Sequence, residues 1–137
     1  MRTPMPDPIL RMLEQPNPAV IAVVRPDGSP ASAAVWVLWE DGELVMTMSP
    51  TGRRRREVER EPRVSVTVLD RDSWYRQVTV HGTVVSLTED TDFADVDRLS
   101  QHYDARPYPD RDVPQITARI RVDRWNQFGF ETRAEPR

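Results

Sequence analysis

Apolar and polar residues alternate along most of the chain after position 18, with the two-residue period that is typical of half-buried β-strands. Short groups of turn residues separate these stretches, and the pairs Asp27-Gly28 and Asp41-Gly42 are typical of tight hairpin turns. The pattern predicts six strands, at 19–24, 30–39, 43–49, 63–70, 74–87 and 115–125. Because the first three strands are joined by such short turns, we expect them to be antiparallel neighbours.

Three short segments carry helical signals instead. Asp7-Pro8 is typical of an N-cap followed by proline, and it predicts a helix at about 8–15. A second helix is expected to run through Arg60, and a third, of about four turns, to follow the capping segment 88–92. Since strands and helices do not alternate as βαβ units, we predict a single domain over 1–137. Its class is mainly β with short helices, with six antiparallel strands in a small closed or nearly closed barrel.

The longest predicted strand, 74–87, contains two informative residues. Gly82 interrupts a valine series that otherwise faces one side, which predicts a β-bulge or a close approach of another backbone. His81 lies on the opposite face, and neither His81 nor His102 has a second histidine at metal-ligand spacing. We therefore expect no metal site, and we interpret His81 as a hydrogen-bonded strand residue.

The composition removes several kinds of chemistry. All 19 basic side chains among the 137 residues are arginines, and the chain contains neither lysine nor cysteine. Lysine Schiff bases, thiolate catalysis, disulfides and cysteine-zinc sites are therefore excluded, so any reaction must rely on other groups or on a bound cofactor. The sequence also lacks a run of 18 apolar residues and a basic-apolar leader, from which we expect no membrane span and a cytoplasmic protein.

Positive charge is concentrated in one segment. The net charge is −3, yet residues 53–63 hold six arginines against three glutamates, so the remainder of the chain is acidic. A nucleic-acid-binding domain would instead present an extended basic face to many phosphates. We therefore expect no nucleic-acid partner.

Four successive arginines, at 53–56, fall in the first turn of the second predicted helix, where the helix dipole disfavours positive charge. Two interpretations stay open. In one, the segment is a solvated surface helix held by two i,i+4 ion pairs, Arg53–Glu57 and Arg55–Glu59. In the other, the helix start binds a phosphate or carboxylate, helped by the hydroxyl groups of Ser49 and Thr51.

The order and spacing of four stretches resemble a known family. These stretches are 25–49, 54–68, 74–90 and 117–125. They resemble the flavin/deazaflavin oxidoreductases related to pyridoxamine 5′-phosphate oxidase, and among them the branch that binds coenzyme F420, a deazaflavin with a phosphate and an oligoglutamate tail. The resemblance implies a six-stranded split β-barrel, assembled as a homodimer with the cofactor in a groove between the subunits.

The resemblance also implies three groups of cofactor-binding residues. The deazaflavin ring would lie along Ala33, Ala34, Val35 and Trp36. The ribityl chain, the phosphate and the tail would be held by Thr47, Met48, Ser49, Thr51, Arg53 and Arg54. The other subunit would contribute Trp74, Tyr75 and Arg76. Of these last three, Tyr75 and Arg76 are the candidate catalytic residues, which would polarise the substrate.

Two positions depart from the family pattern. Arg54 stands where lysine is common, and arginine keeps the charge and can bind phosphate through two hydrogen bonds. Glu57 stands where asparagine is common, and it places an acid near an anionic tail, which is expected to weaken binding.

The function implied by the resemblance is hydride transfer between reduced F420 and an unsaturated small-molecule acceptor, with the cofactor supplying the chemistry. Three alternatives stay open. The first is an FMN-dependent oxidase or reductase of the same fold, and the second is a non-catalytic protein that binds a flavin, a deazaflavin or a tetrapyrrole. The third, a nucleic-acid binder built on the arginine helix, is disfavoured by the acidic remainder of the chain.

Overall fold

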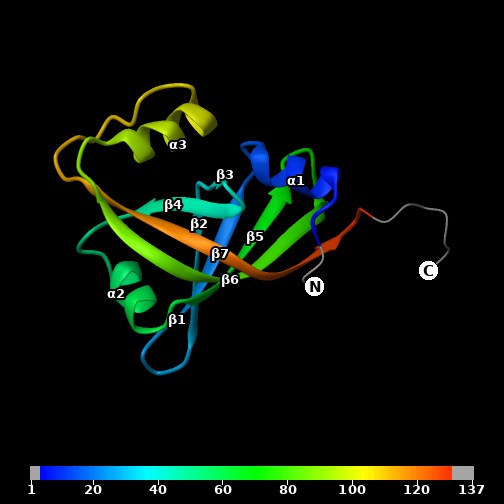
Figure 1. The fold of residues 1–137 in the computed structure, drawn as a ribbon, viewed down its shortest axis with the longest axis horizontal. Helices are drawn as coiled ribbons and strands as arrows, with labels where there is room; N and C mark the ends of the chain where they lie inside the picture. The colour runs from blue at the N-terminus through cyan, green and yellow to red at the C-terminus, as the bar shows by residue number, and fades with distance from the viewer. Residues whose placement is uncertain (1–3, 131–137) are drawn as a thin grey trace.

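The structure, a computed structural model, describes residues 4–130. Its seven strands are β1 (Ala19–Val24), β2 (Pro30–Val35), β3 (Leu38–Glu40), β4 (Glu43–Met48), β5 (Arg63–Asp70), β6 (Ser73–Asp90) and β7 (Gln115–Phe128). They form one antiparallel sheet in the order β2-β1-β5-β6-β7-β4-β3. The three helices are α1 (Asp7–Glu14), α2 (Arg53–Arg60) and α3 (Ala94–Asp104). In Figure 1, α1 and α3 lie toward one end of the curved sheet and α2 toward the other.

The predicted class, mainly β with short helices, is confirmed, but the sheet has seven strands rather than six because 30–39 is two strands. β2 ends at Val35, β3 begins at Leu38, and the two occupy opposite edges of the sheet. Only three residue steps join these edges, which limits their separation there to roughly 11 Å. The sheet must therefore curl into a barrel. Residues 33–39 form an unbroken apolar run, so the sequence contains no turn residue that would mark the change of partner strand.

The barrel interior is filled by inward-facing side chains of the strands. Along β1, β5 and the middle of β6, buried residues alternate with half-buried ones, as a two-residue period requires. Side chains with almost no exposure include Ile21, Leu44, Met46, Val66 and Ile120. Each of these side chains contributes roughly 1.5–3 kcal/mol to the stability of the fold through burial of its apolar surface. α1 packs against the same core through the buried residues Ile9, Met12 and Leu13.

The prediction for Gly82 is confirmed. The pairing of β6 with β7 shifts register between His81 and Gly82, which marks a β-bulge. A Cβ atom at position 82 would overlap the carbonyl oxygen of Arg121 and the Cγ2 methyl group of Ile120. Glycine is therefore required here by the close approach of the neighbouring strand.

The helices begin near the expected places, with differences that the strands explain. The prediction of Asp7 as the N-cap of α1 is wrong, because the helix already begins at Asp7 and its N-cap is Pro6. α3 has 11 residues, about three turns rather than four, because β6 continues through the expected capping segment to Asp90. The buried carboxylate of Asp90 accepts hydrogen bonds from the N–H groups of Asp95 (3.1 Å) and Val96 (3.0 Å), and so caps α3 from the end of the strand. Within residues 4–130, none of the helices is long and apolar enough to cross a membrane.

Candidate functional site

α2 begins without the usual stabilising features of a helix start. Its N-cap is Gly52, which has no side chain to cap it, and its first turn contains no acidic residue. Instead, Arg55 and Arg56 fold back and donate hydrogen bonds to the carbonyl oxygens of Pro50 (3.1 Å) and Thr51 (3.0 Å). Backbone N–H groups at the positive end of the helix dipole therefore stay available to an anion.

Arg53 and Arg54 differ from their neighbours on this helix. Within the described part of the chain, neither guanidinium group forms a hydrogen bond or an ion pair. The predicted pair Arg53–Glu57 is wrong, because the Glu57 side chain is buried, at 6% exposure, and its Oε2 faces Nε of Arg25 at 3.9 Å. The predicted pair Arg55–Glu59 is confirmed, with 3.4 Å between Nε and Oε2. Two unpaired arginines at an uncapped helix start favour the anion-binding interpretation over the ion-paired surface helix.

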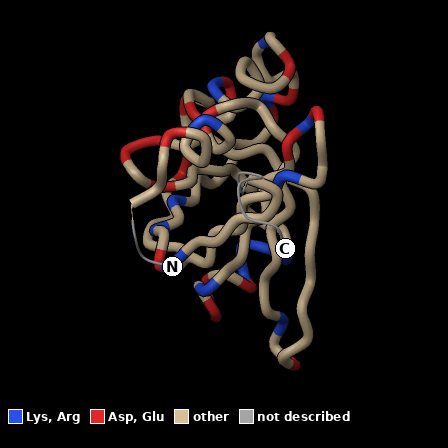
Figure 2. Tube along the Cα trace, turned by 90° about the vertical axis from the view of Figure 1, so that its right-hand side faces the viewer, with Lys and Arg blue, Asp and Glu red and all other residues tan. Residues whose placement is uncertain are grey.

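Most of the other arginines among residues 4–130 have acidic partners. Figure 2 shows basic and acidic residues interleaved along the trace. The shorter ion pairs include Arg63–Glu61 (2.8 Å), Arg76–Asp70 (2.9 Å), Arg111–Asp97 (2.6 Å) and Arg119–Glu43 (2.8 Å). The hydrogen bonds from Arg63 lower the pKa of Glu61 to about 2. Arg11, Arg71 and Arg124 also lack acidic partners, but only Arg53 and Arg54 are unpaired neighbours at a helix start within the described residues.

A cavity of about 350 Å³, here named the arginine cavity, lies beside the start of α2 and strands β1 and β2. Its lining includes five residues that the family resemblance assigns to the cofactor, namely Ala33, Met48, Ser49, Arg53 and Arg54. The charged groups that line it are the guanidinium groups of Arg25, Arg53 and Arg54 and the carboxylate of Glu57. The cavity therefore carries net positive charge, and it suits a phosphate or carboxylate group, which arginine can hold through two parallel hydrogen bonds.

Sequence reasoning missed Arg25 and the burial of Glu57. Arg25 directly follows β1, in the turn to β2. α2 is drawn to this turn because Arg60 Nη2 donates a hydrogen bond to the carbonyl oxygen of Val24 at 2.8 Å. This contact joins residues 36 positions apart, so no local pattern could predict it. The only sequence feature that could have indicated a role for Arg25 is its position beside the Asp27-Gly28 turn.

Two other predicted cofactor residues lie outside the lining of the arginine cavity. Thr51 is exposed at the helix start, and its N–H group donates to Ser49 Oγ at 3.4 Å. Thr47 is half-buried in β4, where it pairs with Thr117, and its side chain faces away from that of Met48 because successive strand residues face opposite sides. The assignment of both threonines to the cofactor stays a prediction.

A second cavity, of about 600 Å³ and here named the tryptophan cavity, lies at the other end of β2. Its lining includes Ala34, Val35, Trp36, Arg71 and Tyr103. The Trp36 ring stacks on the Tyr103 ring, with centroids 5.5 Å apart and planes 11° from parallel. Residues 33–36, which were expected to follow one cofactor ring, are thus divided between the two cavities, with Ala33 in the arginine cavity.

Tyr103 fixes α3 against this second cavity. Its hydroxyl group donates a hydrogen bond to the carbonyl oxygen of Asn17 at 2.8 Å and accepts one from the N–H group of Val37 at 3.2 Å. Burial raises the pKa of Tyr103, so the hydroxyl group stays protonated and able to donate at neutral pH.

Trp74, Tyr75 and Arg76 do not line either of these cavities. Trp74 and Tyr75 are 72% and 68% exposed, and the rings of Tyr75 and Phe128 pack at a steep angle with their centroids 4.9 Å apart. Arg76 is ion-paired with Asp70 at 2.9 Å, next to the turn between β5 and β6. Within one subunit these three residues are therefore not brought to the arginine helix, and their contribution from a second subunit stays a prediction.

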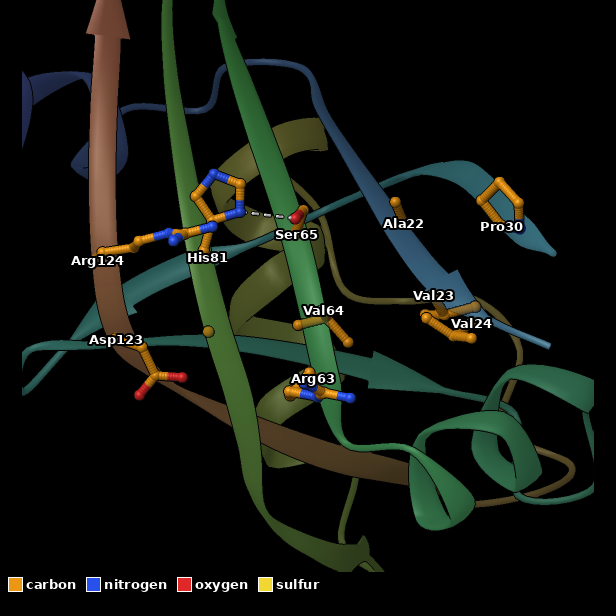
Figure 3. Close-up of a pocket in the computed structure, with 11 residues that line it drawn as sticks. Ala22, Val23, Val24, Pro30, Arg63, Val64, Ser65, His81, Asp123 and Arg124 are labelled. Carbon is orange, nitrogen blue, oxygen red and sulfur yellow. Dashed lines mark hydrogen bonds between the residues drawn. The ribbon is translucent and has the colours of Figure 1, made fainter. Parts of the chain in front are cut away.

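The outer face of the sheet carries a third and larger cavity, of about 960 Å³ (Figure 3). Ser65, His81 and Arg124 lie side by side there on β5, β6 and β7, and His81 Nδ1 is hydrogen-bonded to Ser65 Oγ at 3.0 Å. Burial, together with the charge of Arg124, lowers the pKa of His81. The interpretation of His81 as a hydrogen-bonded strand residue is confirmed. Among residues 4–130, no group of three His, Cys, Asp or Glu side chains could hold a metal ion.

Comparisons with known proteins agree with the fold described above. The family profile of pyridoxamine 5′-phosphate oxidase matches residues 5–128. Among solved structures, an F420 reductase is 28% identical, with 89% of this chain and 98% of that chain covered and a TM-score of 0.81.

More distant structures share the fold. A putative pyridoxamine 5′-phosphate oxidase from Listeria innocua is 22% identical over 88% of this chain and 95% of that chain, with a TM-score of 0.67. HupZ from Group A Streptococcus is 20% identical over 81% and 84%, with a TM-score of 0.61. No curated protein sequence matches the chain significantly.

Proposed function

The chain belongs to the pyridoxamine 5′-phosphate oxidase family, a family of flavin-type oxidoreductases, and from this premise we propose that it is a coenzyme F420-dependent reductase of a small unsaturated acceptor. The observation that carries the proposal is the arginine cavity. There, an uncapped helix start and the unpaired guanidinium groups of Arg53 and Arg54 meet beside strand β2. The similarity to an F420 reductase supports the choice of cofactor.

The residues present fit the anionic half of such a cofactor. A phosphate at the start of α2 would accept hydrogen bonds from backbone N–H groups and from Arg54, which can donate two in parallel. A neighbouring cavity of about 600 Å³, here named the turn cavity, shares Arg25, Arg53 and Glu57 with the arginine cavity. Its lining adds two further arginines, Arg56 and Arg60, and the acid Asp27. These two additional arginines beyond the phosphate position support a ligand with more than one anionic group, such as a deazaflavin with a glutamate tail.

The ring half of the cofactor is proposed to lie along β2. Ala33 and Ala34 are small, so a planar ring could approach the strand closely, and the half-buried Trp36 would bound it at the far end. When bound, the reduced deazaflavin supplies the hydride that the acceptor receives. The contribution of the protein is to bind the anionic groups, to orient the ring and to exclude water from it.

The proposal includes a homodimer in the cytoplasm. Among the described residues, Trp74 and Tyr75 keep most of their ring surface exposed, and the outer face of the sheet carries the mainly apolar 960 Å³ cavity. A second copy on this face would bury these groups and bring its Tyr75 and Arg76 to the acceptor, where they would polarise it. Light scattering of the purified protein tests the dimer, and a monomer at micromolar concentration contradicts it.

A titration tests the cofactor. Purified protein is titrated with F420 and with FMN while tryptophan fluorescence is followed, and both titrations are repeated with Arg54→Ala. The matched control is Arg55→Ala, because Arg55 lies on the same helix but lines neither cavity and is held by Pro50 and Glu59. We expect saturable quenching by F420, at least tenfold weaker binding in Arg54→Ala and no change in the control.

Other outcomes select the alternatives. Quenching by FMN alone would favour the FMN-dependent enzyme. Binding without turnover of any acceptor would favour a carrier or storage protein. If neither cofactor binds while single-stranded DNA binds with a steep salt dependence, the oxidoreductase proposal fails.

A further inference from the structure

The side chain of Glu57 is an unusual component of an anion site. It is buried, at 6% exposure, and it lines both the arginine cavity and the turn cavity. Its Oε2 atom is fully enclosed and has no hydrogen-bond partner within the described residues. The nearest charged donor, Nε of Arg25, lies at 3.9 Å, which is beyond hydrogen-bond distance.

A buried carboxylate oxygen without a hydrogen-bond donor destabilises the folded protein, so such an oxygen is expected where a bound ligand supplies the donor. The groups around Glu57 divide into two kinds. Arg53, Arg54 and the start of α2 attract an anion, whereas the Glu57 carboxylate repels one and attracts O–H or N–H donors. A ligand that matches both must carry an anionic group and, next to it, a hydrogen-bond donor.

We infer that Glu57 is a specificity-determining residue that accepts a hydrogen bond from a hydroxyl group adjacent to the bound phosphate, so that the arginine cavity selects phosphate esters of polyols over phosphate esters of simple alkyl chains. The inference rests on the proposed function, since it assigns a role to Glu57 within the same phosphate site. Three arginines and one glutamate line the cavity, so it keeps a net positive charge toward such a phosphate even with Glu57 ionised.

A different role for Glu57 would be to position Arg25. The two roles predict different results, because a misplaced Arg25 would weaken the binding of every phosphate ester to the same degree. Loss of a hydroxyl contact would weaken only the ligand that carries the hydroxyl group. The change in the ratio of two affinities therefore separates the roles.

The experiment compares two ligands of equal chain length and charge, ribitol 5-phosphate and pentyl phosphate. Their dissociation constants are measured by calorimetry with the full-length protein and with Glu57→Ala and Glu57→Gln. The matched control is Glu59→Gln, since Glu59 lies on the same helix, is half-exposed and lines neither cavity. Thermal melting of each variant checks that it is folded.

We expect the preference for ribitol 5-phosphate over pentyl phosphate to fall by about tenfold or more in Glu57→Ala, as the loss of a hydrogen bond to a charged group predicts. Glu57→Gln should keep part of the preference, because its side-chain carbonyl still accepts a hydrogen bond, and it should bind pentyl phosphate more tightly because the repelling charge is gone. The control should match the unmodified protein. Should Glu57→Ala fail to fold, the reduced preference in Glu57→Gln still decides the question.

Three outcomes overturn the inference. They are an unchanged ratio in both variants, an equal loss for both ligands, and no binding of either ligand by the unmodified protein. Failure of the proposed function is a separate result, in which the unmodified protein discriminates between the two phosphates as expected but binds neither F420 nor FMN.

Discussion

The ring of Trp36 lies parallel to the ring of Tyr103, 5.5 Å away, so that the link between two edge strands is held directly against the last turn of α3. The Tyr103 hydroxyl group adds hydrogen bonds to the backbone at Asn17 and Val37. One side chain therefore connects α3 to the segment before β1 and to the link between β2 and β3. This contact makes α3 part of the wall of the tryptophan cavity.

Replacement of Tyr103 by phenylalanine should keep the stacking but lose the hydroxyl group. The carbonyl oxygen of Asn17 and the N–H group of Val37 would lose a partner, so we expect unfolding in urea to become easier by about 1–3 kcal/mol. Tyr108→Phe, in the loop after α3, is the control and should cost less than about 0.5 kcal/mol. Equal stabilities for the two variants would show that the Tyr103 hydroxyl bonds contribute nothing.

Gly82→Ala should be the most damaging single-methyl substitution in the sheet. The added Cβ atom would overlap the backbone of Arg121, which cannot move without breaking the β6–β7 pairing. We expect the free energy of unfolding to fall by about 3 kcal/mol or more, measured as a shift of the unfolding midpoint. The control is Gly52→Ala, where the backbone is in an ordinary extended conformation and the nearest contact is Ser49 Cβ at 3.3 Å. A Gly82→Ala protein as stable as this control would contradict the observed bulge.

Arg54→Lys should bind F420 less tightly than the unmodified protein but more tightly than Arg54→Ala. Lysine keeps the positive charge but loses the two parallel hydrogen bonds of the guanidinium group. The affinity of the unmodified protein should also fall more steeply with salt than that of Arg54→Ala, because one charge contact with the ligand is missing in the variant. Fluorescence titrations at two salt concentrations measure both effects, and identical affinities for all three proteins would remove Arg54 from the site.

Stability should depend on pH through His81. In the folded protein its pKa lies below the ordinary value of about 6.5, so the unfolded chain binds more protons than the folded chain at mildly acidic pH. The free energy that neutral His81 contributes to folding is therefore fully present above about pH 6.5, and it is lost as the pH falls from there through the lower pKa of the folded protein. Because the ring is half-buried, the loss should stay under about 1 kcal/mol. Urea unfolding at pH 7.5 and 5.5 measures it, and His81→Gln should show a smaller difference between the two pH values than the unmodified protein.

The features that local sequence determines were predictable. The Asp41-Gly42 turn and the glycine bulge at position 82 each follow from backbone conformations that only certain residues adopt. The split of 30–39 into two strands was not predictable, because the apolar run 33–39 contains no turn residue at the point where the chain changes its partner strand.

In the candidate site, too, some features were predictable from local sequence and others were not. The arginines at the start of α2 are visible in the sequence because they conflict with the helix dipole. The burial of Glu57 and its approach to Arg25 depend on how α2 docks against the end of β1, which is a contact between distant parts of the chain. The proposed contribution of Trp74 from a second subunit depends on an interface between chains, which the pattern within one chain does not encode.

The position of β7 also determines when the protein can become stable during synthesis. β7 lies between β6 and β4, yet it leaves the ribosome after both of them. Until it emerges, β6 is paired only with β5 and β4 only with β3, so each has an unpaired edge that can pair with another chain. A truncation before Gln115 should therefore leave a protein that aggregates, even though it would retain α2 and every residue that lines the arginine cavity.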